Sequence, residues 1–249
     1  MNKTIIGVSL FSFSVLFSAT TFAQTTPDYA KLIEQAHQKY KSNNDGKVAD
    51  YIPALATYSP KNFAITIATV DGKIYQVGDV NKPFPMESLS KVFTMALAME
   101  QHGPQVVLDK LGANATGMPF NSGLAVELTK GAPESPLVNA GAMSTVSLIE
   151  AKDKTDRWNK ILDNLNVWAD ATLTVNEPVF KSEMETNQHN QALAKLMESY
   201  NSFYGNTDEA VEIYTRQCSV DITVEQLAKM GAVLANKGKS PFNGKQLLN

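Results

Sequence analysis

The sequence predicts a mixed α/β or α+β fold in a single domain, with strands early in the chain and helices dominating later. A helix and a hairpin precede residue 80, and helical patterns fill most of the chain after it. No internal repeat or low-complexity linker divides the chain. Hydrophobic residues make up 43% of the 249 residues and charged residues 19%, which is typical of a globular protein.

The first predicted elements are a helix and a β-hairpin. The helix begins at Asp28 or Tyr29, where apolar residues start to recur at helical spacing. Residues 63–77 then alternate apolar with polar or small side chains on both sides of a turn. Asp71-Gly72 is typical of a two-residue hairpin turn, so we expect the chain to reverse there.

Later helices are predicted from the residues that begin and end them. The apolar run after Ser88 ends at Gly103-Pro104, because glycine accepts the left-handed conformation and proline cannot continue a helix. Gly238 ends the last helix in the same way. Three further helices begin at a capping residue followed three positions later by Glu or Gln: Ser182 with Glu185, Asn206 with Glu209, and Thr223 with Gln226.

The first 23 residues are predicted to be a secretory signal peptide. Lys3 supplies the positive charge, residues 5–17 form a short apolar run, and small residues precede a cleavage site before Gln24. The run is shorter than the roughly 20 apolar residues of a membrane-spanning helix. We therefore expect a periplasmic or secreted protein whose single domain covers residues 24–249 and which has no membrane segment after cleavage.

Charge and composition exclude several classes of partner and cofactor. A net charge of −3 and a pI near 5.7 give no basic surface for nucleic acid and no charge run for lipid headgroups. The three histidines have no metal-ligand spacing, so neither a metal nor another cofactor is expected. Cys218, the only cysteine, cannot form an internal disulfide and is expected to be buried; nothing around it or His189 supports a cysteine hydrolase.

Ser88 and Lys91 are the strongest candidates for chemistry. Residues three apart share a helix face, so the Lys91 amine is expected within reach of the Ser88 hydroxyl. A serine at a helix start also lies where backbone N–H groups favour developing negative charge. This S-x-x-K arrangement is that of Ser-Lys acyl-transfer hydrolases, although the short pattern also occurs by chance on solvated helices.

Three further polar residues are weaker candidates. Glu183 and Asn190 are seven apart and would point the same way from one helix after two turns, into a shared pocket. Alternatively, Glu183 complements a helix dipole and Asn190 lies on the surface. Asn139 precedes three small residues, which fits either a tight turn with close backbone packing or an N-cap.

Six segments, in order, resemble the bacterial glutaminases, whose fold is related to serine β-lactamases and penicillin-binding proteins. The resemblance covers about residue 28 to the C-terminus and is far more specific than S-x-x-K alone. The segments are Val48–Ala56 (VADYIPALA), Glu87–Phe93 (ESLSKVF), Pro119–Ser122 (PFNS), Asn139–Ala142 (NAGA), Phe180–Glu183 (FKSE) and Tyr214–Ser219 (YTRQCS).

This resemblance implies a reaction and a set of residue roles. Ser88 would attack the side-chain amide of L-glutamine, with Lys91 as base and Tyr51 as a proton relay, to give a glutamyl ester and then L-glutamate and ammonia. The family's substrate-binding positions correspond to Ser88, Asn139, Glu183, Asn190 and Tyr214. The resemblance also implies a β-lactamase-like antiparallel sheet flanked by helices, and a homo-oligomer.

Two differences from the family pattern qualify this expectation. Ser135–Val138 (SPLV) replaces the usual Asn-Pro beside the pocket. The chain also stops at Asn249, before a second pocket tyrosine and a glycine-rich strand that supplies an oxyanion-hole donor, so the sequence predicts a C-terminally truncated domain with little or no activity. The alternatives are a penicillin-interacting Ser-Lys enzyme of the same fold and a non-catalytic glutamine-binding fragment.

Overall fold

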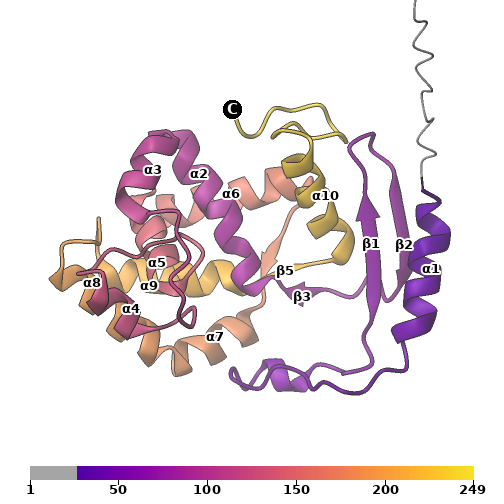
Figure 1. The fold of residues 1–249 in the computed structure, drawn as a ribbon, viewed down its shortest axis with the longest axis horizontal. Coiled ribbons are helices and arrows are strands. Elements are labelled where there is room, and N and C mark those ends of the chain that lie inside the picture. Colours follow the sequence, from indigo (N-terminus) through magenta and orange to yellow (C-terminus); the bar gives the residue numbers. More distant parts are fainter. Residues whose placement is uncertain (1–26) are drawn as a thin grey trace, which may run out of the picture.

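A computed structural model describes residues 27–249 of the chain (Figure 1). The predicted signal peptide, residues 1–23, lies outside the described residues. Within residues 27–249, no helix has both the length and the apolar character needed to cross a membrane. The described part consists of a hairpin layer on one side and a larger body of helices on the other, joined by a small sheet (Figure 1).

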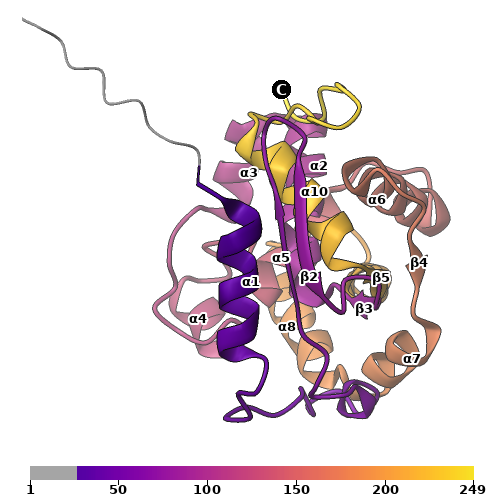
Figure 2. The same cartoon turned by 90° about the vertical axis from the view of Figure 1, so that its right-hand side faces the viewer.

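The hairpin layer places two antiparallel strands between two helices. Strands β1 (Ala64–Ala68) and β2 (Ile74–Gly78) pair antiparallel, while α1 (Tyr29–Tyr40) covers one face and α10 (Val224–Ala235) covers the other (Figures 1 and 2). The Asp28 side chain caps α1 by accepting the Lys31 N–H at 3.0 Å. The predicted helix start and the predicted hairpin are both confirmed.

The hairpin turn lies one residue earlier than predicted. The Gly72 N–H donates to the Thr69 carbonyl at 3.0 Å, so Val70 and Asp71 occupy the centre of the turn. Gly72 follows them in the left-handed region, with φ of +81°. A turn followed by a left-handed glycine matches the twist of the strands, which explains why the glycine does not occupy the centre.

The helical body surrounds α5 (Asn139–Leu148), in which every residue is buried. In the core of this body, the Phe93 and Trp168 rings pack edge to face, 5.2 Å apart. The other helices of this body are α2 (Ser90–His102), α3 (Pro104–Leu111), α4 (Gly123–Leu128), α6 (Lys154–Ala169), α7 (Glu177–Thr186), α8 (Gln188–Ser199) and α9 (Thr207–Cys218). The described chain also contains two 3₁₀ turns, η1 (Leu55–Thr57) and η2 (Glu87–Leu89).

A three-stranded antiparallel sheet brings distant segments together between the two layers. Its order is β3 (Phe84–Pro85), β5 (Val220–Ile222) and β4 (Thr174–Val175). The strand β3 leads into the turn that carries Ser88, β4 leads into α7, and β5 follows α9. The sequence analysis did not predict this sheet, because strands of two or three residues are too short to show an alternating pattern.

The capping boxes predicted at Asn206, Thr223 and Ser182 have different outcomes in the structure. Asn206 caps α9 by accepting the Glu209 N–H at 2.9 Å, but in the described residues the Glu209 side chain does not return the bond, so only half of that box forms. Thr223 with Gln226 forms the expected reciprocal box on α10. The prediction at Ser182 was wrong, because the cap of α7 is Asn176, six residues earlier, with Pro178 in the first turn. The Ser182 hydroxyl instead accepts the Ala54 N–H at 3.2 Å, which ties the segment after Tyr51 to α7.

Glu183 and Asn190 do not lie on one continuous helix, so that prediction was wrong. Glu183 belongs to α7 and Asn190 to α8, and the chain changes direction between them at Asn187. The buried Asn187 side chain donates to the Thr215 hydroxyl of α9 at 3.2 Å, which favours the break over a continuous helix.

Gly141 lets the start of α5 pack directly against the loop before it. A Cβ atom built at this position would lie 1.9 Å from the Ser135 carbonyl oxygen, closer than any real contact. We expect Gly141→Ala to lower the free energy of unfolding by at least about 2 kcal/mol, because the loop must move. Gly231→Ala is the matched control in α10, since a Cβ there has no neighbour within 4 Å and alanine favours a helix. Urea unfolding of both variants measures the difference, and equal stabilities would contradict the account.

Candidate active site

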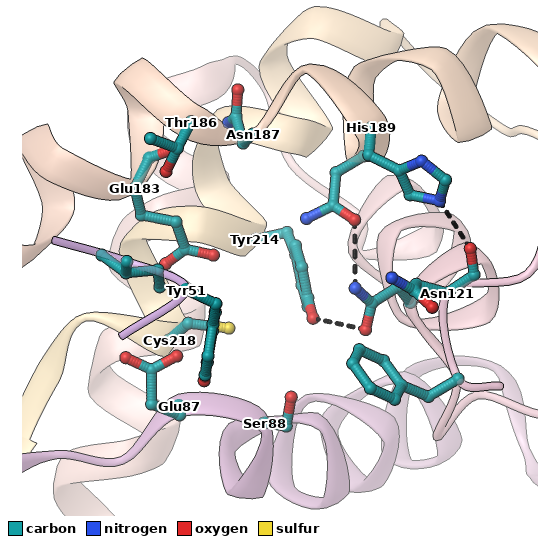
Figure 3. Close-up of a pocket in the computed structure, with 14 residues that line it drawn as sticks. Tyr51, Glu87, Ser88, Asn121, Glu183, Thr186, Asn187, His189, Tyr214 and Cys218 are labelled. Atoms are coloured by element: carbon teal, nitrogen blue, oxygen red, sulfur yellow. Dashed lines mark hydrogen bonds between the residues drawn. The ribbon is translucent and has the colours of Figure 1, made fainter. Parts of the chain in front are cut away.

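A cavity of about 310 Å³ opens where η2, α5, α7, α8 and α9 converge (Figure 3). It is large enough for an amino acid and is lined mainly by polar side chains. All the residues that the sequence analysis selected line this cavity except the buried Lys91, which contacts the lining residue Asn139. The lining residues among them are Tyr51, Ser88, Asn139, Glu183, Asn190 and Tyr214.

Ser88 lies at the base of the cavity in the 3₁₀ turn that precedes α2. The sequence analysis expected Ser88 to begin the helix. In the structure the helix begins at Ser90, so Ser88 lies just before its first regular turn. The side chain is exposed, and Figure 3 shows its hydroxyl pointing into the cavity. The next serine, Ser90, is buried, and its hydroxyl donates to the Glu87 carbonyl at 2.7 Å. Of these two serines, only Ser88 is available to a ligand.

Lys91 is buried next to the cavity, with 4% of its surface exposed. Its Nζ donates to the Asn139 Oδ1 at 2.7 Å and to the Leu137 carbonyl at 3.3 Å. Within residues 27–249 it makes no hydrogen bond to Ser88, although the two residues are three apart. Burial lowers the pKa of the Lys91 ammonium, and the nearby Cys218 and Glu183 oppose part of this effect. A lysine with a lowered pKa is a better base at neutral pH than an exposed lysine.

Asn139 connects three other predicted site residues. Its Oδ1 accepts a hydrogen bond from the Lys91 amine. The same Oδ1 also accepts from the Tyr214 hydroxyl at 3.2 Å, and its Nδ2 donates to the Asn190 Oδ1 at 3.0 Å (Figure 3). Asn139 is the first residue of α5 and caps nothing, so it fits neither a tight turn nor an N-cap. The small residues after it do pack closely, as Gly141 shows. The network fixes the position of the Lys91 amine relative to the cavity.

Glu183 and Tyr51 both face the cavity, but Glu183 is buried and Tyr51 is exposed. Glu183 is 8% exposed, and its buried Oε2 has no hydrogen-bond partner among residues 27–249. Burial first, and the neighbouring Glu87 second, raise the pKa of Glu183 to about 8. Tyr51 lies at the rim with 68% of its surface exposed, and its ring points between Glu87 and Ser88 (Figure 3).

Glu87 is a pocket residue that the sequence analysis did not identify. It lines the cavity beside Ser88, its Oε1 is buried without a partner among the described residues, and burial raises its pKa to about 7. Its backbone has φ of +49°, in the region that side chains other than glycine rarely adopt. Its position directly before the candidate nucleophile was the one feature of the sequence that could have indicated a role for Glu87 in the site.

His189 and Cys218 also line the cavity, although the sequence analysis gave neither a role in the site. His189 Nε2 makes a hydrogen bond of 2.6 Å with the Asn121 carbonyl, which holds the loop at Phe120 against α8. Cys218 is buried in the floor, as expected, and burial raises the pKa of its thiol well above its usual value. A neutral thiol is a poor nucleophile, so the arrangement disfavours a Cys218–His189 hydrolase.

The described residues contain no cluster of three or more His, Cys, Asp or Glu side chains that could hold a metal ion.

Comparisons with known proteins agree on one family. The family model for glutaminase matches residues 46–249. A glutaminase of Colwellia psychrerythraea is 48% identical over 223 residues, covering 90% of this chain and 72% of the relative. Glutaminase 1 of Escherichia coli K12 is 45% identical over 216 residues, covering 87% and 70%.

Solved structures of similar proteins give the same result. A probable glutaminase, ybaS, superposes with a TM-score of 0.86 at 44% identity, covering 88% of this chain and 71% of that one. A probable glutaminase from Bacillus subtilis, complexed with 6-diazo-5-oxo-L-norleucine, gives 0.79 at 27% identity, covering 90% and 69%. The mixed architecture is thus the β-lactamase-like fold expected from the sequence. The chain belongs to the glutaminase family.

Proposed function

We propose that the chain hydrolyses the side-chain amide of L-glutamine to L-glutamate and ammonia through an acyl-enzyme on Ser88. The observation that carries this assignment is the combination of an accessible Ser88 with a buried Lys91, whose amine is fixed by Asn139 at the edge of the same cavity. Nucleophile, base and orienting group are the three parts of a serine hydrolase site.

The first step joins Ser88 to the substrate. Neutral Lys91 accepts the hydroxyl proton while the Ser88 oxygen attacks the amide carbonyl carbon, and collapse of the tetrahedral intermediate releases ammonia and leaves a glutamyl ester. Tyr51, whose ring points between Glu87 and Ser88, relays the proton from the Lys91 ammonium to the leaving nitrogen, so both Tyr51 and Lys91 are neutral again when ammonia departs. Water then attacks the ester with Lys91 again as base, which regenerates the serine.

The remaining predicted residues hold the amino-acid end of the substrate. The Glu183 carboxylate has an unpartnered oxygen that fits the α-ammonium. Asn190 Nδ2 and the Tyr214 hydroxyl lie around Asn139 and fit the α-carboxylate. A ligand without these two groups would leave buried polar atoms unpaired, so the site should reject simple amides.

Three assays on purified protein distinguish this function from the alternatives. We expect ammonia release that prefers L-glutamine to L-asparagine and is lost in Ser88→Ala. Covalent labelling of Ser88 by a β-lactam without ammonia release would indicate a penicillin-interacting enzyme instead. Calorimetric binding of glutamine without turnover would indicate a non-catalytic binding protein. The low turnover expected from the sequence stays a prediction, which the first assay also measures.

The reactivity of Ser88 can be followed separately from turnover with an alkylating reagent. The Bacillus subtilis relative is described in complex with 6-diazo-5-oxo-L-norleucine, a diazoketone analogue of glutamine. We propose that the same compound alkylates Ser88 here with loss of dinitrogen. Its labelling rate reports the nucleophile and base even where overall turnover is slow.

Location and assembly are proposals that rest on sequence and family resemblance. We propose export to the periplasm or the medium after cleavage before Gln24, and assembly as a homo-oligomer. N-terminal sequencing of protein recovered from a periplasmic extract tests the first proposal, since an intact Met1 would contradict it. Light scattering of the purified protein tests the second, since a monomer mass would contradict it.

A further inference from the structure

Two carboxyl groups meet at one end of the cavity, and only one of them has been given a role above. Glu183 reaches this end from α7, and Glu87 reaches it from η2 directly beside Ser88 (Figure 3). Their proximity is reflected in the pKa of Glu183, which the charge of Glu87 raises further after burial. The two segments are distant in the sequence and are brought together by the small sheet that β3 and β4 share with β5.

Both carboxyl groups are left without partners by the protein itself. The Glu183 side chain is more than nine-tenths buried, and its Oε2 has no hydrogen-bond partner; the same holds for the buried Oε1 of Glu87. Within residues 27–249 neither group takes part in an ion pair. Buried acceptors that remain unpaired are costly, so they indicate a site that a donor-rich ligand completes.

We infer that Glu87 and Glu183 together form the subsite for the substrate's α-ammonium, with Glu87 as a second, specificity-determining carboxylate. This inference rests on the proposed function. An ammonium has three donors and one positive charge, so it can satisfy both orphaned oxygens at once, which a neutral or N-acylated amine cannot. The subsite lies directly beside Ser88, so binding at the ammonium end also positions the rest of the substrate near the nucleophile.

Proton release on binding is a consequence of this arrangement. Burial raises the pKa of Glu87 to about 7 and that of Glu183 to about 8, so the empty subsite holds protons at neutral pH. The other titratable groups around the two carboxyl groups are Tyr51, Tyr58 and Cys218, which face Glu87, and Tyr214 and Lys91, which face Glu183. An arriving ammonium stabilises the charged carboxylates, lowers both pKa values and releases protons to the buffer.

The test compares Glu87→Gln with the unsubstituted parent for two ligands. Protection of Ser88 against the diazoketone gives the affinity for L-glutamine and for N-acetyl-L-glutamine, which keeps the side-chain amide but has no ammonium. We expect Glu87→Gln to weaken protection by glutamine about ten- to a hundredfold and to leave protection by the acetylated ligand within about twofold. Calorimetry in two buffers of different ionisation enthalpy should show less proton release by the variant.

Matched variants separate the possible outcomes. Glu183→Gln should reproduce the loss for glutamine, and Glu185→Gln, an exposed residue of the same helix, should have no effect. An equal loss for both ligands, or no loss for glutamine, in a folded Glu87→Gln protein would overturn the inference while the proposed function stands. Failure of the parent to recognise glutamine at all would overturn the proposed function and this inference with it.

Discussion

Replacing Lys91 by methionine should lower the rate at which Ser88 is labelled or acylated by about 10³ to 10⁴ at neutral pH. Methionine fills a similar volume in the buried site but cannot accept the serine proton. The Asn139 amide oxygen also loses its donor at 2.7 Å, so the orienting network loosens. Pseudo-first-order labelling rates of parent and variant give the ratio directly.

The pH dependence shows whether Lys91 acts as a base. Burial lowers the pKa of its ammonium, and only the neutral amine accepts a proton, so the parent's rate should rise with pH and level off below the range of an ordinary lysine. The variant should lose this rise. Lys31→Met, on the exposed surface of α1, is the control and should match the parent. Labelling of Lys91→Met within tenfold of the parent would contradict the assignment.

Removing the hydroxyl of Ser88 should have the largest effect of all. Loss of a covalent nucleophile reduces catalysis by about 10⁶, so Ser88→Ala should show only background ammonia release. The fold should be retained, because Ser88 is exposed and its side chain fills no part of the buried core. Circular dichroism and thermal unfolding verify that the loss is chemical.

Ser90→Ala is the matched control for this substitution. The Ser90 hydroxyl lies two residues away but is buried, bonded to the Glu87 carbonyl at 2.7 Å and to the Gln217 side chain at 3.1 Å. Its removal should cost about 1 to 2 kcal/mol of stability and leave most of the activity. If both alanine variants lose activity equally, the hydroxyl of Ser88 has no special role.

The sequence predicted those parts of the fold that depend on neighbouring residues. The first helix, the hairpin and the caps at Asn206 and Thr223 all depend on interactions within a few positions, and the structure confirms them. The errors arose where distant contacts decide the outcome. The break at Asn187 follows from a hydrogen bond to Thr215 on another helix, which no local pattern reveals.

The site could be predicted in composition but not in geometry. Family resemblance selected residues that the structure places around one cavity, yet it gave no indication that Asn139 would join Lys91, Tyr214 and Asn190 in a single network. Glu87 was missed for a physical reason. Its importance depends on burial, on a left-handed backbone and on a facing carboxylate from α7, and all three are properties of the folded chain.

The central claim is that Ser88 is the nucleophile, and mapping the diazoketone adduct by peptide mass spectrometry tests it most directly. Cys218 lines the same cavity and Ser90 is two residues away, so the chain itself offers competing positions. The account predicts one adduct, on the Ser88 side chain, that disappears in Ser88→Ala. An adduct on Cys218 or Ser90, or labelling that persists in Ser88→Ala, would contradict it.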